Sequence, residues 1–313
     1  MAVIGAGAFG KNHLRVIHQS EHAALAGVLD TVPDRAQQAA AAHGCPIFTS
    51  LEDLAASSDA AVVATPTITH AEIGCRLMQA GLDVLIEKPI ASELASARCL
   101  LEAADRYGRI LQVGHLERFN PAVIALEAAL TKPLFFEIHR LSEFSPRSLD
   151  VDVVLDLMIH DLDIVLSMVG KPPEEIRAAG ISILSSKVDI ANVRLQFPGG
   201  VIANLTASRV STERVRKLRL FQPHEYISLD YSRQDAVRFR VKPPGGIDFG
   251  KLDVSKDEPL RLELEDFFQS IVSRRPPRVT GAQGYQALEA AQAILDKIEE
   301  HSRLVKGTLE TTA

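Results

Sequence analysis

The glycine-rich segment Gly5–Gly10, close to the start of the chain, constrains the fold more than any other feature. An apolar run, Ala2–Ile4, precedes it, and a helical pattern, Phe9–His18, follows it. Asp30 ends the next apolar run, Ala24–Leu29, and lies 20 residues after the last glycine. A Gly-x-Gly-x-x-Gly turn between a strand and a helix, followed by an acid at this spacing, predicts binding of a dinucleotide.

Each position in this turn has a physical role. Gly5 allows the tight turn, Gly7 lets a pyrophosphate approach the backbone, and Gly10 lets the helix pack closely on the strand. The helix then begins at Ala8 and Phe9, and its N-terminus offers unpaired amides and a positive dipole end to the phosphates. We therefore expect all five residues to contact the cofactor.

Asp30 bears on which dinucleotide binds. A carboxylate at the end of the second strand accepts hydrogen bonds from the adenosine ribose hydroxyls. It also repels a 2′-phosphate, so the sequence predicts NAD rather than NADP. Thr31 and Arg35 follow closely enough that NADP remains an alternative.

The first ~115 residues alternate between short apolar runs and helical patterns, as in repeated βαβ units. Runs without polar alternation are typical of a buried parallel sheet with helices on both faces. The further strands expected are Ala60–Ala64, Asp83–Ile86 and Ile110–Val113, and the further helices are Pro33–His43, Ala71–Ala80 and Leu94–Tyr107.

The pattern changes near Asn120-Pro121, where helices no longer separate the strands. We expect an α/β protein with a Rossmann domain at 1–118 and a second α/β domain at 119–313, built on a largely antiparallel open sheet. The closing helices could pack on either domain. The elements expected are helices Pro121–Leu130, Val153–Val169, Leu260–Arg274 and Gly284–His301, and extended runs Leu134–Phe144, Ile176–Leu184, Ile190–Phe197, Val201–Ser208, Val215–Gln222, Tyr226–Tyr231 and Ala236–Val241.

Glu87-Lys88-Pro89 follows an apolar strand, at the sheet edge where ligands bind. Pro89 restricts the backbone of Lys88 and raises the odds of a cis bond. An ammonium held there could bind a sugar hydroxyl and stabilise developing alkoxide charge. The alternative is a surface lysine that ends a strand.

Asp156 and His160 are four residues apart on an otherwise apolar helix, so they lie on one face. Histidine is the usual general base near neutral pH, which makes His160 a candidate base. A solvated polar pair is the alternative. A metal site at this position is not predicted, because oxidation of an alcohol by a dinucleotide does not require one.

Composition excludes some classes of protein. The net charge of −6 argues against a nucleic-acid partner. The three cysteines, Cys45, Cys75 and Cys99, form no CxxC pair, so we expect small buried side chains in a reducing compartment rather than disulfides or zinc ligands. Neither a signal segment nor a membrane span is apparent, which predicts a cytoplasmic protein.

These motifs, together with Thr65-Pro66 followed by His70, resemble the Gfo/Idh/MocA oxidoreductase family over essentially the whole chain. The resemblance implies that Lys88 and His160 flank the reacting carbinol and that Asp156 assists them. It also implies cofactor contacts from Thr65, Pro66, His70, Glu87, Lys88 and Arg118, and substrate contacts from Lys88, His115, Asp156, His160 and Arg209.

Two stretches, Val113–Pro121 and Asp152–Asp161, look like the branch that oxidises UDP-N-acetylglucosamine at C3. In that branch an aminotransferase converts the 3-keto sugar before lipid A assembly. Val153-Val154 and Leu116 replace the glycines and the asparagine of many relatives, which argues against generic sugar or inositol specificity. A dehydrogenase of a free cyclitol or simple sugar is the alternative. A non-catalytic NAD-binding regulator would not need Lys88, Asp156 and His160 together.

A nucleotide-sugar diphosphate needs cations, and the second domain offers several arginines. Arg209 is the preferred candidate for binding the diphosphate, because it ends an apolar strand. The candidates are Arg140, Arg147, Arg209, Arg214 and Arg216.

We also expect a homodimer or homotetramer, because an open sheet face is covered economically by a second copy. Apolar alternate residues in Ala191–Phe197 and Val201–Ala207 are the predicted contact.

Overall fold

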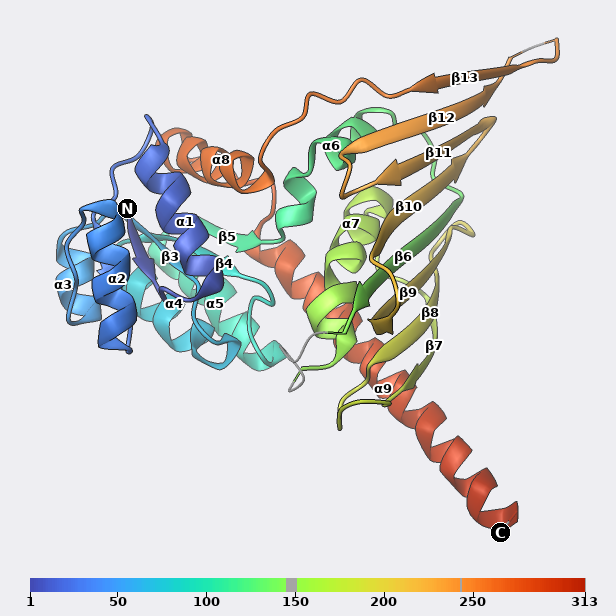
Figure 1. The fold of residues 1–313 in the computed structure, drawn as a ribbon, viewed down its shortest axis with the longest axis horizontal. Helices are drawn as coiled ribbons and strands as arrows, with labels where there is room; N and C mark the ends of the chain where they lie inside the picture. Colours follow the sequence, from blue (N-terminus) through green and yellow to red (C-terminus); the bar gives the residue numbers. More distant parts are fainter. Residues whose placement is uncertain (145–150, 243, 313) are drawn as a thin grey trace. The chain divides into compact units, whose positions relative to one another are not determined.

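The computed structural model describes residues 1–144, 151–242 and 244–312, with side chains of the last helix described as far as residue 303. The described chain divides into two compact units (Figure 1). The first contains residues 1–119 and 257–285, and the second contains residues 120–256 and the chain from 286 onward. Helix α9 (Gly281–Thr312) begins in the first unit and continues in the second.

The first unit is built on a five-stranded parallel sheet in the order β2-β1-β3-β4-β5. Its strands are short and almost wholly buried, as their unbroken apolar character predicts. The strand order reverses between β1 and β3, and ligands bind at the carboxyl ends of the strands at such a point. The strands are β1 (Ala2–Ile4), β2 (Gly27–Leu29), β3 (Ala60–Val63), β4 (Asp83–Glu87) and β5 (Leu111–Gly114).

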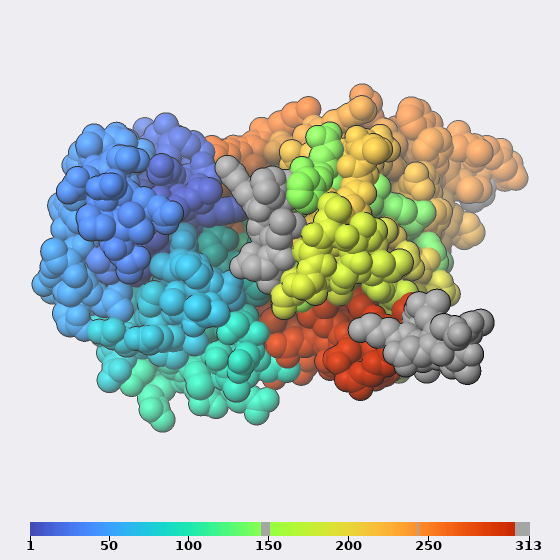
Figure 2. Space-filling view, turned by 60° about the horizontal axis from the view of Figure 1, so that its bottom comes forward, coloured from blue at the N-terminus to red at the C-terminus, as the bar shows by residue number. Residues whose placement is uncertain are grey.

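Helices lie around this sheet (Figure 1), and Figure 2 shows one face of residues 1–119 in blue to teal. Local signals set their ends: Pro33 begins α2, and Gly44 ends it with a left-handed backbone. Helix α3 was not predicted, because it has only six residues and its main signal is a Ser50 cap on the Asp53 amide. The helices are α1 (Ala8–Gln19), α2 (Pro33–His43), α3 (Leu51–Ala56), α4 (His70–Gln79), α5 (Leu94–Tyr107) and α8 (Pro259–Ser273).

Helix α8 returns to this unit from far along the chain. Leu264 and Phe267 are fully buried in one apolar core with Leu14 and Ile17 of α1. The nucleotide-binding fold therefore includes a segment that comes after the whole second sheet in sequence.

The second unit contains an eight-stranded sheet in the order β13-β12-β11-β10-β6-β9-β8-β7. Neighbouring strands are antiparallel apart from β6 and β9, which confirms the predicted largely antiparallel sheet. The strands are β6 (Phe135–Glu143), β7 (Glu175–Ile181), β8 (Ile190–Gln196), β9 (Ile202–Ser211), β10 (Val215–Gln222), β11 (Glu225–Asp230), β12 (Asp235–Val241) and β13 (Ile247–Lys251).

Helices α6 (Pro121–Ala128), α7 (Ile159–Val169) and α9 cover one face of this sheet (Figure 1). The core lies on that face, where Leu195 and Leu205 of the sheet pack in one cluster with Ile164 of α7. No helix among the described residues covers the other face of the sheet (Figure 1). Strand β13, which was not predicted, is an edge strand whose Ile247 and Phe249 are exposed.

The open face corrects one expectation. Ala191, Val193, Leu195 and Phe197 are fully buried in the unit's own core, so the predicted contact residues do not face outward. The exposed residues between them are Asn192, Arg194 and Gln196. Apolar side chains gather instead further along the sheet, in an aromatic row with ring centroids 4.8–5.7 Å apart: Phe135, Phe221, Tyr226, Phe239 and Phe249.

The cysteines differ from the prediction that they are small buried side chains. All three are free thiols as predicted, but Cys45 and Cys75 are only half-buried and Cys99 is exposed, so none is a core residue. No helix among the described residues has the length and apolar character that crossing a membrane requires.

Candidate functional site

The glycine turn has the geometry of a phosphate-binding loop. Gly5 has a left-handed backbone, and a Cβ on it would overlap the carbonyl oxygen of Ala64. A Cβ on Gly10 would overlap the carbonyl oxygen of Gly5. Gly7, by contrast, has nothing within 4 Å of where its Cβ would be, which leaves its backbone open to a ligand. The turn therefore leads into the N-terminus of α1 as a dinucleotide requires.

Asp30 follows β2 and is joined to this turn. Its Oδ2 accepts a hydrogen bond from the Ala6 amide at 2.6 Å, and its Oδ1 accepts one from Val32 at 2.8 Å. A carboxylate can accept about four hydrogen bonds. Asp30 therefore keeps acceptor capacity for ribose hydroxyls, and Thr31 and Arg35 are exposed beside it.

His70 joins two loops at the carboxyl edge of the sheet. It is buried, with Nδ1 3.0 Å from the carbonyl oxygen of Pro89 and Nε2 2.9 Å from that of Thr65. Burial lowers the pKa of His70, so the ring is neutral at neutral pH and donates to one carbonyl at a time. Thr65 is half-buried and Pro66 is exposed, so these two reach the edge of the sheet while His70 supports them.

The Glu87-Lys88-Pro89 segment ends β4, and the Lys88–Pro89 bond is cis. Lys88 is half-buried. The carboxylate of Glu87 turns inward, and its Oε1 lies 2.6 Å from Nε2 of His13 on α1. Glu87 therefore connects the strand that carries Lys88 with the helix that follows the glycine turn.

His115 and Arg118 follow β5 and are both buried. Burial, reinforced by the charges of Lys88 and Arg118, lowers the pKa of His115 to about 3. The structure thus brings Lys88, His115 and Arg118 together, as two cations and one neutral imidazole. The Glu87 carboxylate acts on the same ring with the opposite sign, so this edge of the sheet carries charges of both signs.

Two further polar residues near this edge were missed from the sequence. His13 lies four residues before Ile17, and Glu263 lies four residues before Phe267, so each is on a core-facing side of its helix. Polar residues at apolar helical positions were the available signal. Their juxtaposition depends on α8 returning to the first unit, which no local pattern indicates.

In the second unit, Asp156 lies in a π-helical turn, Val154–Met158, directly before α7. An unbroken α-helix was predicted here, and the wider turn corrects it. His160 is the second residue of α7, and both side chains are half-buried among buried neighbours such as Val154 and Ile159. Single π-helical turns often occur at functional sites, because they redirect side chains that an α-helix would fix.

Arg140 is not available to a diphosphate, which corrects its prediction. It is 1% exposed, and its guanidinium forms two hydrogen bonds of 2.7 and 2.8 Å with the carboxylate of Asp161. The Tyr231 hydroxyl donates to the same carboxylate, and its ring lies 5.0 Å below the guanidinium carbon. This cluster of three residues fixes the beginning of α7, one residue after His160.

Arg209 is also buried. It donates a hydrogen bond to the carbonyl oxygen of Val151 and lies 3.8 Å from Asp189, so it supports the segment that leads to Asp156. Among the other predicted arginines, Arg214 is exposed and Arg216 is half-buried. Arg147 lies outside the described residues.

Comparison with known proteins identifies both parts of the chain. The profile of the Gfo/Idh/MocA oxidoreductase family, described as an NAD-binding Rossmann fold, matches residues 1–115. The profile of the family's C-terminal domain matches residues 123–222.

The chain belongs to the Gfo/Idh/MocA oxidoreductase family.

Within this family, the UDP-N-acetylglucosamine 3-dehydrogenase of Acidithiobacillus ferrooxidans is 37% identical over 302 residues, which cover 94% of this chain and 96% of that enzyme. Its solved structure superposes with a TM-score of 0.91 and covers 96% of this chain and 97% of that one. An inositol 2-dehydrogenase of Rhizobium meliloti is 30% identical but covers 67% of this chain and 68% of that enzyme.

Family membership makes the first unit's cofactor NAD. The residues fit it: Gly5 and Gly10 exclude a Cβ, Gly7 leaves room for a pyrophosphate, and Asp30 retains acceptor capacity for a ribose. In this Gfo/Idh/MocA chain, the first unit therefore carries the nucleotide-binding groups and the second carries the Asp156–His160 pair.

Proposed function

We propose that this chain oxidises the C3 hydroxyl of UDP-N-acetylglucosamine to a ketone with NAD. The 37% identity to the Acidithiobacillus enzyme, extending over nearly the whole of both chains, carries the proposal. Inositol dehydrogenases match a smaller part of the chain at lower identity. A free cyclitol is therefore the second candidate substrate.

The residues take complementary roles in this reaction. His160 accepts the proton of the C3 hydroxyl, because an imidazole is an effective base near neutral pH. The Lys88 ammonium binds the same oxygen and stabilises the negative charge that develops as the proton leaves. Asp156 binds the sugar and orients it toward His160. Bound NAD supplies the hydride acceptor, at C4 of the nicotinamide.

Substrate choice can be tested directly. Purified protein is mixed with NAD and either UDP-N-acetylglucosamine, UDP-glucose or myo-inositol, and reduced nicotinamide is followed by absorbance. Alcohol oxidation is uphill near neutral pH, so an aminotransferase and an amino donor are added to trap the ketone. Of the three substrates, only UDP-N-acetylglucosamine is expected to be turned over. Turnover with inositol and none with nucleotide sugars would transfer the proposal to the second candidate.

The product has a further consequence. A 3-keto nucleotide sugar is a substrate for transamination to a 3-amino sugar, so an aminotransferase is the proposed metabolic partner. The resemblance of the chain to the family branch that acts before lipid A assembly agrees with this role. A cytoplasmic location is proposed as well. A non-catalytic regulator is disfavoured, because it would need neither Lys88 nor the Asp156–His160 pair.

We also propose that the open face of the second sheet joins two copies of the chain. The aromatic row defined above exposes Phe239 and Phe249, at 40% and 59%, without a covering helix. Light scattering should give at least a dimer at micromolar concentration. Replacing both phenylalanines with serine should give a monomer. A wild-type monomer would exclude this assembly.

A further inference from the structure

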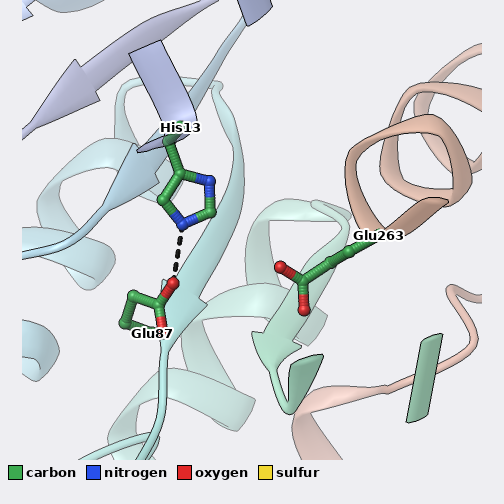
Figure 3. A group of neighbouring side chains, drawn as sticks. All are labelled: His13, Glu87 and Glu263. Atoms are coloured by element: carbon green, nitrogen blue, oxygen red, sulfur yellow. Dashed lines mark hydrogen bonds and ion pairs between the residues drawn. The ribbon is translucent and has the colours of Figure 1, made fainter. Parts of the chain in front are cut away.

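Three polar side chains from distant parts of the sequence meet inside the first unit (Figure 3). His13 comes from α1, Glu87 from the end of β4 and Glu263 from α8. One possible ligand atom from each lies within 4.8 Å of the others, and all three residues are buried. Figure 3 shows the Glu263 carboxylate directed toward the His13–Glu87 pair.

Glu263 has an unusual environment. It is 0% exposed, and both of its carboxylate oxygens lack a hydrogen-bond partner among the described residues, as does Nδ1 of His13. The other charges that act on its carboxyl group are those of Glu87 and Asp266, and both are negative. Buried polar atoms in native proteins nearly always have a partner, so three such atoms in one cluster point to a ligand.

A proton alone would not satisfy this cluster. Burial and the two neighbouring carboxylates raise the pKa of Glu263 well above its usual value, so a neutral carboxylic acid is the competing arrangement. Protonation removes the charge of Glu263, but it provides no partner for Nδ1 of His13. A cation bound among the three side chains neutralises the carboxylates and also occupies their lone pairs.

We propose that His13, Glu87 and Glu263 bind one divalent transition-metal cation, of the kind exemplified by Zn²⁺. One imidazole nitrogen and two carboxylates are donors that Zn²⁺ accepts, whereas Mg²⁺ and Ca²⁺ favour oxygen alone. The cation connects α1, β4 and α8 beside Lys88, so its role is structural. Hydride transfer to NAD does not pass through it. Binding requires a neutral imidazole and two ionised carboxylates, so it strengthens as pH rises.

The test uses the full-length chain, stripped with a chelator, incubated with Zn²⁺ and passed through a desalting column. Mass spectrometry of the metal content should give one zinc per chain at pH 7.5, and Mg²⁺ should not compete. Glu263→Gln, which keeps the size of the side chain, should weaken binding at least about tenfold. Glu265→Gln on the same helix and His18→Asn on α1 are matched controls, because both residues lie outside the cluster.

A second measurement on the wild type does not depend on how the variants fold. Co²⁺ should bind with visible absorption bands that saturate at one equivalent, because an imidazole and carboxylates in a buried site give a low-symmetry environment. A folded wild-type chain that retains neither zinc nor cobalt overturns the proposal. So does an infrared band of a protonated carboxylic acid that persists in the wild type after incubation with zinc and is lost in Glu263→Gln.

Discussion

The two units differ in the sequence separation between their functional residues and the residues that hold them in place. In the first, the glycine turn and Asp30 belong to one βαβ segment, and Asp30 accepts a hydrogen bond from Ala6 within it. In the second, His160 lies on a helix whose beginning is fixed by Arg140 of β6 and by Tyr231, which follows β11. The cofactor half is thus organised by local sequence, and the half with the proposed base by distant residues.

This difference has a chemical reason. A dinucleotide presents the same pyrophosphate and ribose to every protein, so one short motif can serve many chains. A substrate differs between members of a family, and the groups that meet it are held by tertiary contacts that can vary independently. Substitutions in one unit should therefore leave the function of the other unchanged.

Replacing the proposed base tests the second unit alone. His160→Asn should lower kcat by about 10²–10⁴, because it removes the group that accepts the hydroxyl proton. NAD affinity, measured by fluorescence or calorimetry, should be unchanged, because the nucleotide-binding residues belong to the first unit. Unchanged turnover would remove His160 from the mechanism.

The buried cluster next to His160 should be the second unit's most sensitive structural point. Arg140→Met leaves the Asp161 carboxylate buried without its ion pair and should destabilise the chain by about 3–5 kcal/mol. Arg177→Met removes an exposed pair with Glu175 and should cost less than about 1 kcal/mol. Urea unfolding measures both. Equal effects would show that the burial of Arg140 has no consequence for stability.

His115 makes the first unit sensitive to acid. The folded protein keeps this ring neutral down to a pKa of about 3, whereas the unfolded chain protonates it near pH 6.5. Unfolding therefore takes up a proton between these values, and stability falls as pH is lowered through that range. The loss is about 1.4 kcal/mol for each pH unit below 6.5.

His115→Gln should flatten this dependence, when urea midpoints at pH 7.5 and pH 5 are compared. The exposed His22→Gln variant provides the control. An unchanged acid dependence in His115→Gln would exclude His115 as its source.

Asp30 should set the choice between the two dinucleotides. Asp30→Asn keeps an acceptor for the Ala6 amide but removes the charge that repels a 2′-phosphate. The ratio of kcat/KM for NADP to that for NAD should rise about tenfold, equivalent to about 1.4 kcal/mol. Asp34→Asn, an exposed change on α2, should leave the ratio unchanged. A wild-type preference for NADP would contradict the role given to Asp30.

Sequence patterns predicted the strands and most of the helices of residues 1–119, because their signals are local, but they did not predict α3 or the packing of α8 with this unit. They could not predict that Arg140 pairs with Asp161, 21 residues away, or that Tyr231 joins them from 70 residues away. Arg140 was therefore predicted as a candidate for binding the substrate diphosphate, although it is buried. The π-helical turn at Asp156 was missed for a related reason, since an apolar helical period does not distinguish it from an α-helix.

The open sheet face is a second case in which local sequence did not predict tertiary packing. Alternation in Ala191–Phe197 correctly indicated one apolar side of a strand, but only the packed helices decide which side is covered. The aromatic row is formed by residues on several strands, so no single stretch of the sequence predicts it. Local sequence thus predicts which residues alternate, and tertiary packing decides where they point.

The proposed reaction transfers the C3 hydrogen of UDP-N-acetylglucosamine to NAD as hydride. It is tested most directly with substrate that carries deuterium at C3, in the presence of the aminotransferase trap. Mass spectrometry should find one deuterium in the reduced nicotinamide and none when the label is at C4 of the sugar. Unlabelled reduced nicotinamide from the C3-labelled substrate, or label transferred from C4, would contradict the account.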